Sequence, residues 1–324
     1  MSESSSINSS LLNPELSCNQ RQFQPILDIS IVIPTHNRCD SLNRVFDSLQ
    51  FQSHVDLKKV EIIIIDDGSS DDTSKIVKQM TYNAKIATQY FFQLKKGPAA
   101  ARNIGIRNAR GEIILFLGDD TLASPDLLRQ HIEFHKFQHP EPHTAILGFC
   151  PMVETPALKS SLIQSWLNRK QMAFQNLSHM QMISHNYFYT CNVSLKRDFL
   201  LKNGLFDESY PFAAGEDIEL GSRLMTAGMI LYYSKNALAY HVHPMSLFEY
   251  INRYFKMGRS TAIKSKITGR SGPGLKGSRD KLSPLWVRSP LKFIFYFILY
   301  LISISAVISG FFYEKFKHNF SSWK

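Results

Sequence analysis

Short apolar runs that end in polar residues alternate with amphipathic segments over the first 120 residues. Three of these runs predict strands that are buried on both faces: residues 29–34 (ISIVIP), 61–67 (EIIIIDD) and 111–120 (GEIILFLGDD). After the first run, apolar residues recur at helical spacing over 41–51 with Asp40 as the predicted N-cap, and another helix is predicted from Thr73. Strands that alternate with helices predict an α/β fold with a doubly wound, mainly parallel sheet.

A helix is also predicted in the segment GEDIELGSRLMTAGM, residues 215–229. Its apolar residues recur at helical spacing, and Gly228 supplies a stop signal. Glu216 and Asp217 therefore stand at the N-terminus of this helix. They fit either a simple interaction with the helix dipole or the role of a general base.

The last quarter of the chain contains a long apolar run without charge. Residues 293–312 are bounded by Lys292 and Glu314, and as a helix they would be about 30 Å long, enough to cross a hydrocarbon core. A buried helix of a soluble protein is the alternative, but three Ser, two Tyr and one Gly provide no polar face. The run predicts a transmembrane or membrane-inserted helix at 291–313.

The positive charge of the chain lies beside this run. The formal net charge is +10, and residues 1–247 carry net −1 whereas residues 248–324 carry net +11. The positive-inside rule predicts a membrane-associated protein with its large N-terminal part in the cytoplasm, and the basic flank is expected to attract anionic lipid. No nucleic-acid recognition motif accompanies the charge, so nucleic acid is not an expected partner.

Acidic residues stand at the carboxyl ends of two predicted strands, which is where doubly wound sheets bind ligands. Asp66 and Asp67 follow four isoleucines and fit either a turn or a contact with a base or ribose. Asp119 and Asp120 end the third strand, where two adjacent carboxylates repel each other unless a cation is bound. Carboxylate oxygens suit Mg²⁺ or Mn²⁺ bridging phosphates.

Two histidines in the strand-like run AYHVHP are candidates for the same site. His241 and His243 are two residues apart in this run. We expect one of them to enter the site as a metal ligand or a phosphate donor.

Taken together, several segments resemble the family 2 glycosyltransferases, which have the GT-A fold. They cover about 215 residues in the family's order and spacing, which makes the match specific as a set. The segments are ISIVIPTHNR (29–38), EIIIIDDGSSDDT (61–73), KKGPAAARNIGIRNARGEIILFLGDD (95–120), CNVSLKRDFLLKNGLFDE (191–208), GEDIEL with the following RL (215–224), and the His before Pro244.

The resemblance implies a role for individual residues. Asp217 corresponds to the catalytic base, Asp120 to a direct metal ligand, and His243 to a further contact to metal or diphosphate, with His241 as the alternative. Gly118 stands where the family often has Asp, so one acidic ligand of the usual set is missing. The residues implied to hold the nucleotide are Pro34, Thr35, Asn37, Arg38, Asp67, Asn103 and Asp119.

The function implied is a metal-dependent, inverting transfer of a sugar from a nucleotide-sugar donor, with a UDP-sugar favoured, to a hydroxyl of a saccharide or lipid-linked acceptor. The cofactor implied is Mg²⁺ or Mn²⁺, and the process is synthesis of cell-envelope polysaccharide or glycolipid at the membrane. The alternatives are a nucleotidyltransferase, which shares a nucleotide-binding sheet and an acidic metal site, and an inactive membrane-bound scaffold of the same fold.

The predicted organisation has five parts. They are a disordered N-terminal tail at 1–27, a GT-A domain at 28–245, a basic amphipathic connector at 246–290 that lies on the membrane surface, the membrane helix at 291–313, and a basic tail at 314–324.

Overall fold

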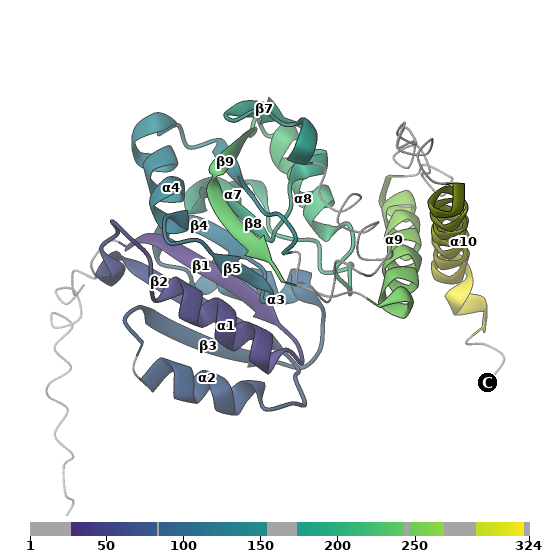
Figure 1. Cartoon of the computed structure of the whole chain (residues 1–324), viewed down its shortest axis with the longest axis horizontal. Coiled ribbons are helices and arrows are strands. Elements are labelled where there is room, and N and C mark those ends of the chain that lie inside the picture. Colours follow the sequence, from purple (N-terminus) through teal and green to yellow (C-terminus); the bar gives the residue numbers. More distant parts are fainter. Residues whose placement is uncertain (1–26, 83, 154–173, 243–245, 269–289, 321–324) are drawn as a thin grey trace, which may run out of the picture.

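A nine-stranded mixed sheet forms the centre of the protein (Figure 1). The structure, a computed structural model of the full chain, describes residues 27–82, 84–153, 174–242, 246–268 and 290–320. The strand order is β3-β2-β1-β4-β8-β6-β9-β5, and β7 pairs with β9. The strands are β1 Leu27–Thr35, β2 Val60–Asp67, β3 Ala87–Gln93, β4 Gly111–Leu117, β5 Thr121–Ala123, β6 Thr144–Phe149, β7 Gln181–Ile183, β8 Asn192–Lys196 and β9 Ile230–His241.

Helices cover both faces of this sheet, as the alternating pattern predicts. The α-helices are α1 Cys39–Leu49, α2 Thr73–Tyr82, α3 Pro98–Asn108, α4 Leu127–Glu133, α7 Arg197–Asn203, α8 Glu216–Thr226, α9 Leu247–Thr268 and α10 Pro290–Phe320. The last two stand beside the sheet domain as a pair of adjacent helices (Figure 1).

The first four strands in the sheet order are parallel, as predicted. Ile31 of β1 pairs with Ile62 of β2 on one side and with Leu115 of β4 on the other. Beyond β4 the sheet is mixed, because β8 runs antiparallel to both β4 and β6. The prediction of a mainly parallel sheet is therefore correct for one half only. An apolar run shows that a strand is buried, but it does not show in which direction the neighbouring strand runs.

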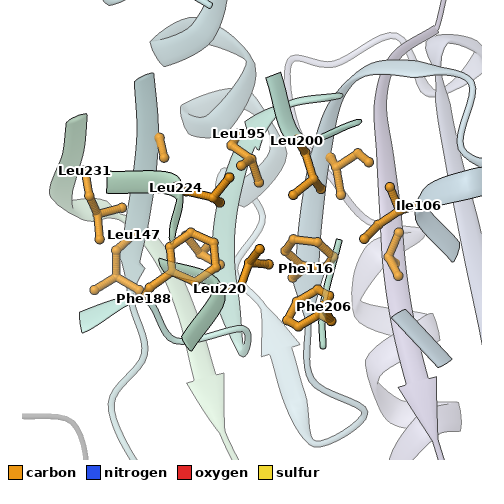
Figure 2. Packing of buried hydrophobic residues seen from close by; sticks show 14 of the residues in the cluster. Ile106, Phe116, Leu147, Phe188, Leu195, Leu200, Phe206, Leu220, Leu224 and Leu231 are labelled. Atoms are coloured by element: carbon orange, nitrogen blue, oxygen red, sulfur yellow. The ribbon is translucent and has the colours of Figure 1, made fainter. Parts of the chain in front are cut away.

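Alternate side chains of the central strands enter two separate hydrophobic cores. Ile31 and Ile62 lie in the core that α1 and α4 cover, whereas Val32 and Ile63 lie in the core that α3, α7 and α8 cover. Figure 2 shows the second core, in which Phe116 of β4 meets Phe206 edge to face at 5.4 Å. Burial on both faces explains why these strands read as continuous apolar runs.

The start of α1 differs from the one predicted from the sequence. Asp40 is not the N-cap of α1, because the helix begins at Cys39 and Asp40 lies in its first turn. The carboxylate of Asp71 accepts hydrogen bonds from the amides of Cys39 (3.2 Å) and Thr73 (3.1 Å). One aspartate from the loop before α2 thus serves the starts of two helices, an arrangement that local sequence does not reveal.

The pair formed by α9 and α10 packs at very short range. A side chain added at Gly258 would overlap the carbonyl oxygen of Val307, and one added at Gly310 would overlap that of Phe255. Arg259 also forms an ion pair with the buried carboxylate of Glu314 at 2.8 Å. The basic connector predicted at 246–290 therefore begins as a helix that has a fixed partner.

Among the residues that the structure describes, none of the helices has both the length and the apolar character needed to span a membrane. The N-terminal tail up to residue 26, His243, the connector from 269 to 289 and residues 321–324 lie outside the described residues.

Candidate active site

The polar residues that end β1, β2 and β4 gather at one edge of the sheet, as expected for parallel strands. Thr35 at the end of β1 lies opposite Asp66 in β2. Its hydroxyl donates a 2.9 Å hydrogen bond to Asp119, which follows β4. Pro34, one residue earlier, is partly buried within β1 and pairs with Ile65.

Asp119 and Asp120 share one cation in this structure. Arg38 Nη1 lies 3.1 Å from Asp119 Oδ1 and 2.5 Å from Asp120 Oδ2. Desolvation and the neighbouring Asp120 carboxylate raise the pKa of Asp119 to about 6, against the opposing effect of Arg38. The repulsion between the two carboxylates is thus compensated by a positive charge from Arg38, for which the family resemblance implies a contact with the nucleotide.

His241, and not His243, is the histidine that the structure describes at this site. It ends β9, and its Nε2 lies 3.4 Å from Asp120 Oδ1. Antiparallel pairing of β5 with β9 places Thr121 opposite His241 and fixes this approach. Because His243 lies outside the described residues, its role stays a prediction.

The donor set around Asp120 suits a divalent cation. Carboxylate oxygens are ligands for Mg²⁺ and Mn²⁺, and His241 adds a nitrogen donor. Within the described ranges, no cluster of three or more His, Cys, Asp or Glu side chains is gathered closely enough to hold a metal ion. Arg38 fills the position between the carboxylates, so metal binding there requires its side chain to move.

A side chain at Gly118 would contact two neighbouring side chains. A Cβ at this position would lie 2.8 Å from Thr121 Oγ1 and 2.9 Å from Asp120 Oδ1. An acidic residue at 118 would therefore require its neighbours to shift.

Asp67 holds a loop in place. Its carboxylate accepts hydrogen bonds from the amides of Lys96 (2.7 Å) and Gly97 (2.9 Å) and from the side chain of Gln93 (2.6 Å). Gly97 has φ +101° and directly precedes α3. These contacts fix the segment between β3 and α3, and a direct contact of Asp67 with the nucleotide stays a prediction.

Two asparagines named from the sequence also connect loops. Asn37 has φ +53°, and its Oδ1 accepts a 2.7 Å hydrogen bond from the amide of Ser70. Asn103 is buried in α3 and bonds both the carbonyl (2.9 Å) and the amide (2.9 Å) of Phe206. Asn37 lies just after β1, whereas Asn103 in α3 holds the loop that contains Phe206.

The acidic pair at the start of α8 is divided between two environments. Glu216 is buried and forms a 2.9 Å ion pair with Arg102 of α3. Asp217 is only partly buried and accepts a 2.8 Å hydrogen bond from the amide of Ile218. Desolvation, followed by the charge of Glu216, raises the pKa of Asp217 to about 7, against the opposing effect of Arg102. Asp217 therefore has the accessibility and the basicity that a general base needs near neutral pH.

Arg102 is the residue of this group that the sequence prediction missed. It is a buried cation that directly follows three alanines in the helix PAAARNIGIRN. A charged residue within a run of small residues indicates that a buried residue of opposite charge pairs with it. The sequence alone does not identify which acidic residue that is.

Comparison with known proteins identifies the family to which this chain belongs. The model of the family "Glycosyl transferase family 2" matches residues 30–199. A validoxylamine A glucosyltransferase of Streptomyces hygroscopicus subsp. jinggangensis is 32% identical over 234 residues, which covers 64% of this chain and 54% of that protein. A hyaluronan synthase of Pasteurella multocida is 28% identical over 244 residues, which covers 67% of this chain and 24% of that protein. The chain thus spans about half the length, or less, of these curated relatives.

Solved structures agree in fold. The mannosyltransferase PcManGT from Pyrobaculum calidifontis, in complex with GDP-Man and Mn²⁺, has a TM-score of 0.59 at 15% identity and covers 88% of this chain and 87% of its own. Residues 1–349 of S. aureus TarS, in complex with UDP, have a TM-score of 0.52 at 16% identity and cover 90% of this chain and 92% of that one. The fold is thus the expected GT-A type, and on the family match, which takes in more than half of its length, this chain belongs to glycosyl transferase family 2.

Proposed function

We propose that this chain transfers a sugar from a nucleotide-sugar donor to an acceptor hydroxyl, with inversion at the anomeric carbon and with the help of Mg²⁺ or Mn²⁺. The observation that carries the proposal is the presence of two acidic sites, Asp119 with Asp120 at the carboxyl end of β4 and Asp217 at the start of α8. Related folds have been solved with GDP-Man and Mn²⁺, with UDP, and with UDP-GlcNAc. We expect a UDP-sugar as the donor.

Each site has a separate chemical task. Asp120 and His241 would hold the metal ion, which when bound supplies positive charge to the departing diphosphate. Arg38 would then be released from the two carboxylates and turn toward the phosphates. Asp217 removes the proton of the acceptor hydroxyl, which is a poor nucleophile while protonated. Attack from the face opposite the leaving group inverts the anomeric centre.

The activity can be tested by following nucleoside diphosphate release over a panel of nucleotide sugars, with Mn²⁺, with Mg²⁺ and with a chelator. We expect slow metal-dependent hydrolysis of at least one donor, because transferases of this kind can pass the sugar to water. Release of pyrophosphate would instead identify a nucleotidyltransferase. Absence of both donor binding and turnover would identify an inactive scaffold.

We further propose that the acceptor is reached at a membrane, on its cytoplasmic side, as a saccharide or lipid-linked acceptor of envelope polysaccharide or glycolipid synthesis. The uncharged run at 293–312 and the net charge of +11 over residues 248–324 support this. Apolar side chains are exposed on both terminal helices, among them Phe248 (77%), Ile298 (49%) and Leu301 (49%). Between α9 and α10 lies a groove of about 500 Å³ lined mainly by apolar residues.

A further inference from the structure

Helix α9 is docked on the loop that leads into the catalytic helix α8. Ser260 donates a hydrogen bond to the carbonyl of Ala214, and Ile263 packs against Tyr210 and Phe212. The guanidinium of Arg259 lies 4.6 Å from the centre of the Phe212 ring. The C-terminal half of α9 therefore has a defined face toward the sheet domain.

Two cations lie on that same face of α9. Arg253, Lys256, Ser260 and Ile263 follow one another at intervals of three, four and three residues, which keeps them on one stripe of a helix. Since Ser260 and Ile263 contact the loop before α8, Lys256 and Arg253 continue the same stripe toward the helix N-terminus. Arg253 is exposed and Lys256 is partly buried.

A third cation reaches this region from the opposite side of the loop. The backbone at Gly97 lies so close to Pro211 that an added Cβ would be 2.7 Å from its carbonyl oxygen. Lys95 belongs to the segment that Asp67 fixes before α3, and its Nζ lies 2.7 Å from His36 Nε2 at the end of β1. Loop 210–214 is therefore packed between the segment of Lys95 and helix α9.

The electrostatic effects on nearby titratable groups are consistent with Lys95, Arg253 and Lys256 lying near this loop. Desolvation is the largest effect that lowers the pKa of Lys256, followed by the charges of Lys95 and Arg259. The charge of Lys95 therefore acts on Lys256. The charge of Arg253 is among the effects that act on the pKa of both Asp217 and His241. In the described part of the chain, none of Lys95, Arg253 and Lys256 forms an ion pair with a carboxylate. Three unneutralised cations beside a nucleotide-binding edge favour an anionic ligand.

We infer that Lys95, Arg253 and Lys256 together bind the diphosphate of the donor, so that α9 completes the donor site from outside the segment 30–199 that defines the family. The inference rests on the proposed function, since it requires a nucleoside diphosphate as ligand. Its chemical basis is the second phosphate of a diphosphate, which adds a negative charge and acceptor oxygens that a nucleoside monophosphate lacks.

The test is calorimetric titration of the full-length chain with UDP and UMP, and with GDP and GMP, in the presence of Mn²⁺. We expect Arg253→Gln and Lys256→Gln each to weaken binding of the diphosphate about tenfold and that of the monophosphate less than threefold. Arg253→Lys should restore most of the affinity. Lys78→Gln, which removes an exposed charge from α2, is the matched control and should bind both ligands like the wild type.

Two outcomes would overturn the inference while leaving the proposed function intact. One is diphosphate affinity within twofold of the wild type in both folded variants, and the other is an equal loss for mono- and diphosphate. In the first of these cases, a raised KM for the acceptor would assign the cations to the acceptor instead. If the wild type binds none of the four nucleotides, both the inference and the proposed function fail.

Discussion

Asp217 and Glu216 are adjacent carboxylates with different surroundings. Glu216 is neutralised by Arg102, whereas Asp217 keeps a partly exposed carboxylate with a pKa raised to about 7. A base must be deprotonated to act, so turnover should rise with pH through about 7 and level off above it. A pH profile of kcat checks this expectation, and an activity that is flat between pH 5 and 8 would contradict it.

Asp217→Asn should lower kcat by a factor of about 10² to 10⁴ and leave donor affinity within about twofold, because the carboxylate acts on the acceptor proton. Steady-state kinetics and donor titration measure the two quantities. Asp198→Asn is the matched control, since Asp198 also lies in the first turn of a helix but is 94% exposed. Turnover within a few-fold of the wild type in Asp217→Asn would reduce Asp217 to a partner of the helix dipole.

Asp120→Ala and Asp67→Ala should separate metal binding from nucleotide binding. Asp120 lies beside His241 and Arg38, so its loss should abolish the dependence on divalent ions and weaken diphosphate binding together. Asp67 fixes the amides of Lys96 and Gly97, so its loss should weaken the nucleotide without changing the metal requirement. Metal titration of both variants, followed by turnover, is the measurement, and equal effects on the metal dependence would refute the division.

At the level of elements, a buried histidine pair joins β8 to α4 and to the π-helical turn Phe134–Gln138 that follows it. His131 bonds Ser194 Oγ (2.8 Å) and Asn192 Oδ1 (2.9 Å), and His135 bonds the same serine at 2.9 Å. Burial lowers the pKa of His131 to about 4. Both rings are therefore neutral at pH 7 and act as structural hydrogen-bonding groups, a role that the sequence pattern did not reveal.

This pair should make the fold sensitive to acid. A histidine whose pKa is lower in the folded than in the unfolded state stabilises the fold above pH 6.5 and loses that contribution as the pH falls toward 4. For His131 the loss is at most about 3 kcal/mol of the free energy of unfolding. His131→Gln should be less stable at pH 7 but lose less stability on acidification, as measured by urea unfolding at pH 7 and 4.5.

His54→Asn provides the control, because His54 is exposed and its φ of +58° is tolerated by asparagine. This variant should retain the acid sensitivity of the wild type. If His131→Gln does so too, the buried pair is not the source of the effect.

At the level of the whole molecule, the terminal helices connect the predicted membrane region to the active site. Helix α10 packs on α9 through Gly258, Gly310 and the ion pair of Arg259 with Glu314. Helix α9 in turn contacts the loop before Asp217 through Ser260. Within the described residues, α10 is thus connected to α8 through two consecutive packing interfaces.

Membrane attachment is tested on exposed residues of α10, so that its packing on α9 is kept. Ile298→Lys with Leu301→Lys should move the protein from the membrane pellet to the soluble fraction, whereas high salt alone should not release the wild type, because burial of apolar surface is insensitive to salt. Tyr82→Lys with Phe137→Lys adds the same charge to exposed apolar positions of the sheet domain and should stay in the pellet. Release of the wild type by salt would show that only the basic residues attach it.

Much of the fold followed from the sequence, because burial on both faces leaves a direct imprint on residue pattern. Apolar runs fixed β1, β2 and β4, and the acidic residues at their ends indicated the edge where the site lies. Helical periodicity placed Asp217 at the start of α8. The direction of β8 was not predictable, because parallel and antiparallel strands in a covered sheet have the same apolar pattern.

The sequence by itself determined which residues carry charge and at which ends of which elements they stand. Only the tertiary structure decided how those charges are paired, since Arg102 is 114 residues from Glu216 and Arg38 is 82 residues from Asp120. It also decided that α9 contacts the loop before α8 through Ser260. The local sequence pattern indicates the burial of one element at a time. The pairing of buried charges depends instead on which distant elements pack against each other, and this packing leaves no periodicity in the sequence.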